Sequence, residues 1–454
     1  MKSLRADRVL TPDGWRDNIR LDIGADGRIA ALSPADGGED RHVAVLLPAP
    51  ANLHSHTFQR AMAGMTERRG PDGRDSFWTW RQLMFRFLDH LTPEDVEAIA
   101  AFAFMEMLEA GYGAVAEFHY LHHQPGGAPF GDLAEMSTRI AAAAAATGIG
   151  LTLLPVLYQH GGCDGRPLSP GQIRFGNDPE RFARLHGAAG KTLAALPADS
   201  RLGVAPHSLR AVDRAGLIAA IGLAPGGPIH IHAAEQVAEV EDMIAALGGR
   251  PVEWLLANAA VDARWCLVHA TQMIPAETIA LARSGAVAGL CPLTEASLGD
   301  GVFDGARFVE SGGRFGFGTD SNISISLAAE LRQLEYAQRL HERGRAVLAD
   351  ADRSTGRVLF DAAVAGGAQA AGRGAGGIAP GAWADLIGLD ASAVDLEGKR
   401  GDDLLDAWIF AMTGNPVADL WSAGRHVVAS GRHFARDAVT ARYRATSARL
   451  RDRL

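Results

Sequence analysis

The sequence predicts an α/β protein in which a (β/α)8 TIM-like barrel carries a small β-sandwich domain formed by both chain ends. The middle of the chain alternates short apolar runs with Ala-rich helical segments, and eight of these runs have the composition of strands. Eight strand–helix units are the number that closes such a barrel. We therefore expect the barrel domain over residues 49–376 and the two parts of the small domain over residues 1–48 and 377–454.

The two chain ends share a pattern of short strands and tight turns. Residues 1–48 contain the runs RADRVL and IRLDIGADGRIAALSP, and the dipeptides Asp13-Gly14 and Asp26-Gly27 are typical of hairpin turns. The segments GIAPGAWADLIGLD and WSAGRHVVASGRHF near the other end repeat this pattern. Short antiparallel strands from both ends are therefore expected to share one domain.

The expected barrel strands are short apolar runs, most of them separated by helical segments such as PEDVEAIAAFAFMEMLEAG. They cover residues 46–53, 114–118, 150–157, 202–206, 228–232, 265–268, 286–290 and 315–318. The carboxyl ends of parallel barrel strands form the active-site face. Residues at the ends of these runs are therefore the first candidates for function.

Charge and cysteine content exclude several classes of protein. The 44 basic and 53 acidic residues give a net charge of −9, whereas nucleic-acid binding needs clustered Lys and Arg. We find no run of about 18 apolar residues that would span a membrane and no apolar signal segment in MKSLRADRVLTPDGW. Cys163, Cys266 and Cys291 form no CxxC motif, which favours a reducing compartment. We expect a cytoplasmic protein without nucleic-acid or membrane partners.

Histidine and aspartate residues stand where several of the expected strands end. His54 and His56 end the first strand, and alternation along a strand points both side chains the same way. His232 ends the fifth strand, His269 follows the sixth and Asp320 follows the eighth. Each residue alone has an ordinary interpretation, such as a core histidine or a helix N-cap. Their convergence at one end of a barrel favours a metal site.

The motifs HSH, HAAE, VHA and GTDSN, in this order, resemble those of the amidohydrolase superfamily in its deaminase branch, over essentially the whole chain. The resemblance implies a hydrolase with one Zn²⁺ per chain, held by His54, His56, His232 and Asp320. Members with two metals bridge them with a carboxylated lysine after the fourth strand. Here His207 follows that strand and the three lysines lie elsewhere, which favours a single metal.

A finer resemblance, to the formimidoylglutamate deiminases, is carried by NLHSHTFQRAMAG, SFWTWR, EFHYLHH, APHSLRAV, HAAEQ, CPLTEASLGDG and GTDSN. It implies a small dicarboxylate amidine substrate, N-formimino-L-glutamate, hydrolysed to N-formyl-L-glutamate and ammonia in histidine degradation. The alternative is a mononuclear deaminase of guanine or a related nucleobase. A non-catalytic scaffold that kept the barrel is a third interpretation. A homodimer remains an open possibility for the assembly.

Three residues are the catalytic candidates in such a reaction. Asp320, besides binding the metal, can accept a proton from the attacking water, and Glu235 can carry a proton to the leaving nitrogen. We expect His269 to hydrogen-bond the attacking water or the new oxygen. Binding of His269 to the metal as a fifth ligand is the alternative.

Recognition of two carboxylates calls for arginines, since the guanidinium group pairs with a carboxylate through two hydrogen bonds. Arg210 follows the fourth strand and Arg81 lies in the insertion after the first. Gln59, Tyr120 and His207 stand just past strand ends and complete the expected substrate-binding set. A surface salt bridge is the alternative for the arginines, and simple packing is the alternative for Gln59 and Tyr120.

The insertion after the first strand contains the aromatic stretch SFWTWRQLMFRFLDHL, most of which is expected to form core or a subunit contact. The preceding Gly70–Gly73 segment would let this insertion act as a lid. His119, His122 and His123 are expected to be loop residues or to support the metal ligands from outside.

Overall fold

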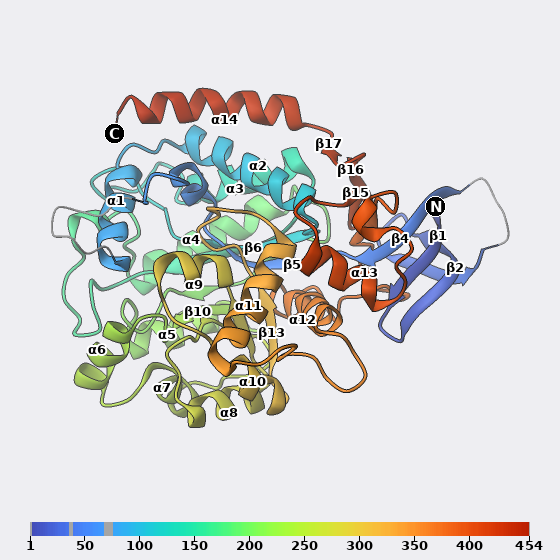
Figure 1. Cartoon of the computed structure of the whole chain (residues 1–454). Coiled ribbons are helices and arrows are strands. Elements are labelled where there is room, and N and C mark those ends of the chain that lie inside the picture. Colours follow the sequence, from blue (N-terminus) through green and yellow to red (C-terminus); the bar gives the residue numbers. More distant parts are fainter. Residues whose placement is uncertain (1, 36–39, 68–75, 454) are drawn as a thin grey trace.

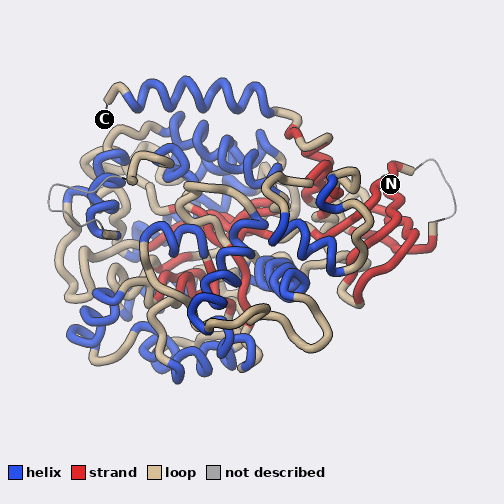
Figure 2. Tube along the Cα trace, viewed as in Figure 1, coloured by secondary structure: helices blue, strands red, loops and turns tan. Residues whose placement is uncertain are grey.

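The computed structural model of the chain describes residues 2–35, 40–67 and 76–453. A central ring of strands is surrounded by helices, and a second sheet projects from one side of it (Figures 1 and 2). The Gly70–Gly73 segment predicted to support a lid lies outside the described residues. Among the described residues, no helix is long and apolar enough to cross a bilayer.

Strands from both chain ends hydrogen-bond into one eight-stranded sheet, in the order β17-β16-β15-β14-β4-β1-β2-β3. Its strands are β1 (Lys2–Thr11), β2 (Gly14–Ile23), β3 (Ile29–Pro34), β4 (Arg41–Pro48), β14 (Leu386–Leu389), β15 (Val417–Ser422), β16 (Arg425–Ala429) and β17 (Arg432–His433). β4 joins the two ends, since it pairs parallel with β1 and antiparallel with β14. At the first hairpin Gly14 has φ +111°, a conformation that favours glycine.

The barrel consists of parallel strands in two runs, ordered β5-β6-β7-β8 with β9 beside β7, and β10-β11-β12-β13. Their bounds are β5 (Ala51–Ser55), β6 (Ala114–His119), β7 (Gly150–Leu157), β8 (Arg201–Leu202), β9 (Ala205–Pro206), β10 (Ile229–Ala233), β11 (Trp265–His269), β12 (Val287–Leu290) and β13 (Arg314–Phe317). Bridges Val204↔Ile229 and Ser55↔Asp320 join the two runs. The strands therefore form a closed ring.

Two expected strands differ from the observed ones. The first, over residues 46–53, crosses from β4 of the terminal sheet into β5 of the barrel. Residues 45–56 are buried throughout, so hydrophobicity gave no sign of a break at Ala49 and Pro50. The fourth, over 202–206, is divided into β8 and β9, which pair with different parts of β7.

Helices cover the outside of the barrel. They are α1 (Phe77–Leu88), α2 (Pro93–Ala110), α3 (Glu135–Thr147), α4 (Pro179–Leu193), α5 (Arg214–Gly222), α6 (Val237–Leu247), α7 (Pro251–Asn258), α8 (Pro275–Ser284), α9 (Pro292–Leu298), α10 (Gly305–Glu310), α11 (Leu327–Glu342), α12 (Thr355–Ala370), α13 (Asp402–Asp406) and α14 (Arg436–Arg451). Shorter turns are η1 (Thr57–Met62), η2 (Pro170–Gln172), η3 (Val394–Leu396) and η4 (Ala407–Ala411). Several helices begin as their sequences dictate. For example, Thr92 caps α2 by accepting the Asp95 N–H, and Pro93 occupies the first position.

The last helix, α14, belongs to the outer layer of the barrel. It runs along α2 (Figure 1), where the rings of Tyr443 and Phe102 stack with centroids 4.0 Å apart. Arg442 also pairs with Glu97 of α2 at 2.6 Å. Residues 377–454 therefore contain strands of the terminal sheet and, after them, a helix that packs on the barrel.

Candidate active site

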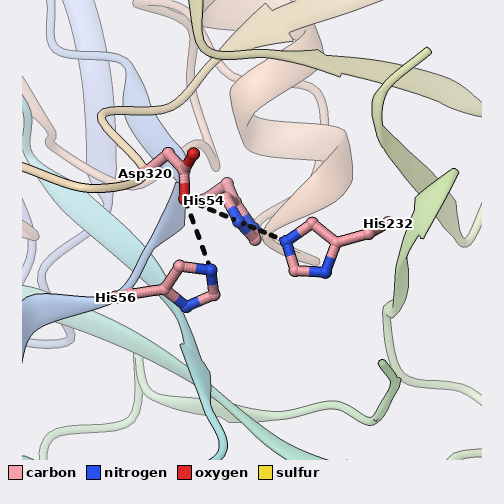
Figure 3. Close-up of side chains that lie close together, drawn as sticks. All are labelled: His54, His56, His232 and Asp320. Carbon is pink, nitrogen blue, oxygen red and sulfur yellow. Dashed lines mark hydrogen bonds and ion pairs between the residues drawn. The ribbon is translucent and has the colours of Figure 1, made fainter. Parts of the chain in front are cut away.

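The four predicted metal ligands converge at the carboxyl end of the barrel strands (Figure 3). All four side chains are buried, and their ligand atoms lie within 4.8 Å of one another. Asp320 Oδ1 lies 3.4 Å from His54 Nε2 and 3.3 Å from His56 Nε2, while the Nε2 atoms of His54 and His232 are 3.1 Å apart. Elements as distant as β5, β10 and the loop after β13 thus supply one cluster.

The hydrogen bonds around this cluster fit a metal ion. Nδ1 of His56 lies 2.9 Å from the Phe118 carbonyl oxygen, and Nδ1 of His232 lies 3.1 Å from that of His207. Because a carbonyl only accepts, both Nδ1 atoms carry the hydrogen, and each Nε2 keeps a lone pair aimed at the cluster. Burial lowers the pKa of His54 to about 3, so its ring is neutral as well. Three neutral imidazoles and a carboxylate are a donor set that Zn²⁺ accepts.

The backbone around the cluster is held in sparsely populated conformations. Asp320, His269 and Ala234 have φ values of +41°, +71° and +54°, although none is glycine. Asn322 fixes the Asp320 segment, since its side-chain amide donates to the Asp320 carbonyl at 3.0 Å and to Ser55 Oγ at 3.1 Å. Strained residues of this kind gather at functional sites, where the surrounding structure must hold them.

His269 lies next to the four-residue cluster, between three carboxylates. Its Nε2 is 3.9 Å from both Glu235 Oε1 and Asp320 Oδ2, and its Nδ1 is 3.3 Å from Glu295 Oε1. Burial acts to lower its pKa, but the carboxylates outweigh burial and raise the pKa of His269 to about 10. His269 Nε2 therefore faces the carboxylates of Glu235 and Asp320 beyond hydrogen-bond distance. Glu295 was not among the predicted site residues, although it lies in the CPLTEASLGDG motif.

The cluster opens into a cleft that holds every predicted site residue except His54, which is fully buried. Its lining consists of His56, Gln59, Phe77, Trp80, Arg81, Met84, Tyr120, Tyr158, Phe175, His207, Arg210, His232, Glu235, His269, Leu298 and Asp320. Gln59 donates to the Tyr120 hydroxyl at 3.0 Å, which joins two predicted residues. His207 Nδ1 lies 2.9 Å from Ser208 Oγ. One cleft therefore combines the cluster of three histidines and Asp320 with the residues predicted to bind the substrate.

The two predicted arginines have different surroundings. Arg210 is half-buried, like Arg81, and pairs with Glu235 at 2.9 Å and with Glu239 at 4.0 Å. Burial acts to lower its pKa, but these two carboxylates hold the pKa of Arg210 above its usual range. Arg81 is half-buried on α1 and donates to the Tyr158 hydroxyl at 2.8 Å.

Helix α1 contributes more to the cleft than its sequence indicated. Phe77, Trp80, Arg81 and Met84 follow helical spacing and all line the cleft. The interpretation of this stretch as mostly core or subunit contact thus missed one whole face. Tyr158 and Phe175 were also missed, because a single aromatic residue in a loop gives no signal of its own.

The histidines after β6 are buried and lie outside the described lining of the cleft. Nε2 of His122 lies 2.9 Å from the Val156 carbonyl oxygen, and Nε2 of His123 lies 2.9 Å from that of Gly176. The ring of His119 packs against that of His122, with centroids 5.4 Å apart. None of these three contacts is with a predicted metal ligand, so support of the ligands by these histidines stays a prediction.

Comparison with known proteins assigns the class. Residues 45–427 match the amidohydrolase family, and the chain belongs to that family. Residues 1–43 match the N-terminal domain of formimidoylglutamate deiminase HutF. The chain is 52% identical to the formimidoylglutamate deiminase of Pseudomonas aeruginosa over 440 residues, which cover 95% of this chain and 96% of that protein.

Solved structures confirm the predicted fold class. The crystal structure of an amidohydrolase from Brucella melitensis superposes with a TM-score of 0.96 at 50% identity, covering 99% of this chain and 100% of that one. An adenosine deaminase from Xanthomonas campestris with bound zinc superposes with a TM-score of 0.83 at 22% identity, covering 99% and 98%. The second likeness is one of fold alone.

Proposed function

We propose that this chain is a formimidoylglutamate deiminase, which hydrolyses N-formimino-L-glutamate to N-formyl-L-glutamate and ammonia in histidine degradation. One observation carries the proposal from the structure. A buried group of three histidines and an aspartate shares a cleft with two proton-transfer candidates and two arginines. The 52% identity to the P. aeruginosa enzyme, over nearly the full length of both chains, supports the same activity.

We propose that His54, His56, His232 and Asp320 together hold one Zn²⁺ per chain. When bound, the metal would polarise a water molecule and lower its pKa toward about 7. The hydrogen bonds of His56 and His232 to backbone carbonyls fix the tautomers that such binding needs.

The surrounding residues can move the protons that the reaction requires. The water oxygen bonds to the formimino carbon, the bond from that carbon to the terminal nitrogen breaks, and the nitrogen must gain protons to leave as ammonia. We assign Asp320 to accept a proton from the water and Glu235 to deliver one to the nitrogen. We assign His269, whose Nε2 faces both carboxylates, to donate a hydrogen bond to the developing oxygen.

We assign recognition of the glutamate part of the substrate to the other predicted residues that line the cleft. Arg210 and Arg81 would each meet a carboxylate, while Gln59, Tyr120 and His207 offer polar groups in the same cleft. Among the described residues, Arg210 Nη1 is buried without a hydrogen-bond partner, so it can donate to a substrate carboxylate without breaking an existing hydrogen bond. Three free cysteines, two of them buried, support the proposal of a cytoplasmic enzyme.

The test is an ammonia-release assay with purified protein and N-formimino-L-glutamate, guanine and formamidine as parallel substrates. We expect rapid release from N-formimino-L-glutamate, slow release from formamidine because it lacks both carboxylates, and none from guanine. Deamination of guanine without activity on N-formimino-L-glutamate would replace this proposal with that of a nucleobase deaminase. Inactivity on all three would contradict both.

A further inference from the structure

Glu239, in the first turn of α6, is a buried carboxylate with both oxygens engaged in the active-site turn. Its Oε1 accepts the backbone N–H of Ala234 at 3.2 Å, and its Oε2 accepts that of Glu235 at 2.9 Å. The side chain has no exposed surface. Glu239 does not line the cleft as described, so it does not contact a substrate there. Its contacts are with the residues that do.

The turn that Glu239 holds is strained. Ala234 has φ +54°, a left-handed conformation that is unfavourable for a residue with a Cβ atom. In such a turn successive N–H groups point into one concavity and attract an anion. Glu239 supplies that anion from within the chain. The backbone of Glu235 is therefore fixed by a carboxylate four residues further on.

The same carboxylate also faces Arg210. Glu239 Oε1 lies 4.0 Å from Arg210 Nε, while Glu235 Oε2 lies 2.9 Å from Arg210 Nη2. Two carboxylates, one just after β10 and one in the first turn of α6, therefore face the Nε/Nη2 edge of the guanidinium. Its remaining Nη1 has no hydrogen-bond partner among the described residues and belongs to a side chain that lines the cleft.

We propose that Glu239 is a positioning residue that sets Glu235 and Arg210 relative to each other. This inference rests on the proposed function, in which Glu235 transfers a proton and Arg210 binds a substrate carboxylate. Glu239 contacts both the Glu235 backbone and the Arg210 side chain. It therefore sets the position of the proton-transfer group relative to that of the group that binds the substrate carboxylate.

The chain offers a matched control in Glu277. It lies in the first turn of α8, is buried, and accepts the backbone N–H groups of Ile274 at 3.0 Å and Glu253 at 3.1 Å. It also pairs with an arginine, since its Oε2 lies 2.7 Å from Arg250 Nε. Neither Glu277 nor Arg250 lines the cleft as described. Glu277→Gln therefore removes the same kind of contact away from the chemistry.

The experiment compares Glu239→Gln and Glu277→Gln in the metal-loaded enzyme. Glutamine keeps the shape but can accept through one atom only, so one backbone N–H loses its partner. We expect Glu239→Gln to keep its metal, to exchange the Ala234 and Glu235 amide hydrogens faster, to lose about 10–100-fold in kcat, and to raise KM. We expect Glu277→Gln to keep the kcat and KM of the wild type.

A second arm separates positioning from general loosening. In an Arg210→Met background, Glu239→Gln should lower kcat again but raise KM no further, because the guanidinium through which it affects binding is gone. Unchanged kcat and KM in Glu239→Gln would overturn the inference. So would equal losses in the two glutamine variants, or a further rise of KM in the Arg210→Met background.

Two provisions keep the test decisive. If Glu239→Gln does not fold, Ala234→Gly is added, since glycine adopts this φ without steric cost, and the pair is compared with Ala234→Gly alone. If the wild type fails to act on N-formimino-L-glutamate, the proposed function has failed. Amide exchange still tests the contact of Glu239 in that case, and wild-type protection in Glu239→Gln would overturn the inference.

Discussion

The two sides of the cleft are built differently, and their arginines show it. On the β10 side, Arg210 follows the barrel strand β9 and faces two carboxylates, that of Glu235 just after β10 and that of Glu239 in the first turn of α6. On the α1 side, Arg81 is half-buried, donates to one neutral hydroxyl, and lies on a helix inserted between β5 and α2.

This difference suggests that the two sides of the cleft contribute differently to the chemical step and to substrate binding. Residues attached to strand ends have little freedom, because a change in their position requires a change in the barrel. A residue on an inserted helix can be repositioned without disturbing the strands. We therefore expect the β10 side to determine the rate of the chemical step and the α1 side to adjust the affinity for substrate.

The largest expected effect is that of metal removal. Treatment with a chelator should abolish ammonia release, and added Zn²⁺ should restore it. The reason is that, in the proposed reaction, the metal ion held by the four ligands activates the water. Elemental analysis should find one ion per chain in active protein. Two ions per chain, or full activity in metal-free protein, would contradict the assigned site.

The next effect is that of Glu235→Gln. Glutamine keeps the shape of the side chain but cannot carry the proton, and general acid–base assistance is typically worth about 10²–10⁴ in rate. We expect kcat to fall by about this factor at normal metal content. Glu241→Gln, on the exposed surface of α6, is the control. A near-normal kcat would mean that Asp320 suffices for both proton transfers.

Arg210→Met should cost about 2–5 kcal/mol in kcat/KM, because a carboxylate of the substrate and that of Glu235 both lose a buried charged partner. The loss should appear in kcat as well as in KM. A substrate analogue with one carboxylate replaced by an amide should show a smaller difference between wild type and variant. Equal differences with both substrates would show that Arg210 does not contact that carboxylate.

Arg81→Met should have the smallest effect, about 1.5–3 kcal/mol, the value of a hydrogen bond to a charged group. It should raise KM and leave kcat close to that of the wild type. Kinetics with the natural substrate and with both monoamide analogues will identify its carboxylate. A loss in kcat as large as that of Arg210→Met would remove the distinction between the two sides.

Most barrel strands and the convergence of three histidines and Asp320 could be predicted from the sequence. The reason is that apolar runs, and the residues at their ends, are recognisable within a few positions of the chain. His54 and His56 stand at the end of an apolar run, and alternation fixes their common direction. The division of residues 46–53 between two sheets was not predictable, since both strands are equally buried. The pattern of apolar residues indicates that a strand is buried, but it does not indicate which sheet the strand belongs to.

Glu239 and Glu295 were missed for a different reason. An acidic residue in the first turn of a helix is common, because it interacts favourably with the helix dipole, and so the pattern gives no functional signal. Only the fold shows that these two carboxylates reach back to Glu235 and His269. The lining face of α1 was missed similarly, since aromatic residues at helical spacing also fit a core.

The central position of β4 also bears on how the protein is made. Leu386 pairs with Pro48, and the whole barrel lies between them in the chain. Closing so long a loop is entropically costly and favours late formation during folding. On the ribosome, one edge of β4 must wait for β14, although β4 leads directly into the strand of His54 and His56. His54 and His56 are thus anchored next to a sheet that is completed only after the whole barrel has been synthesised.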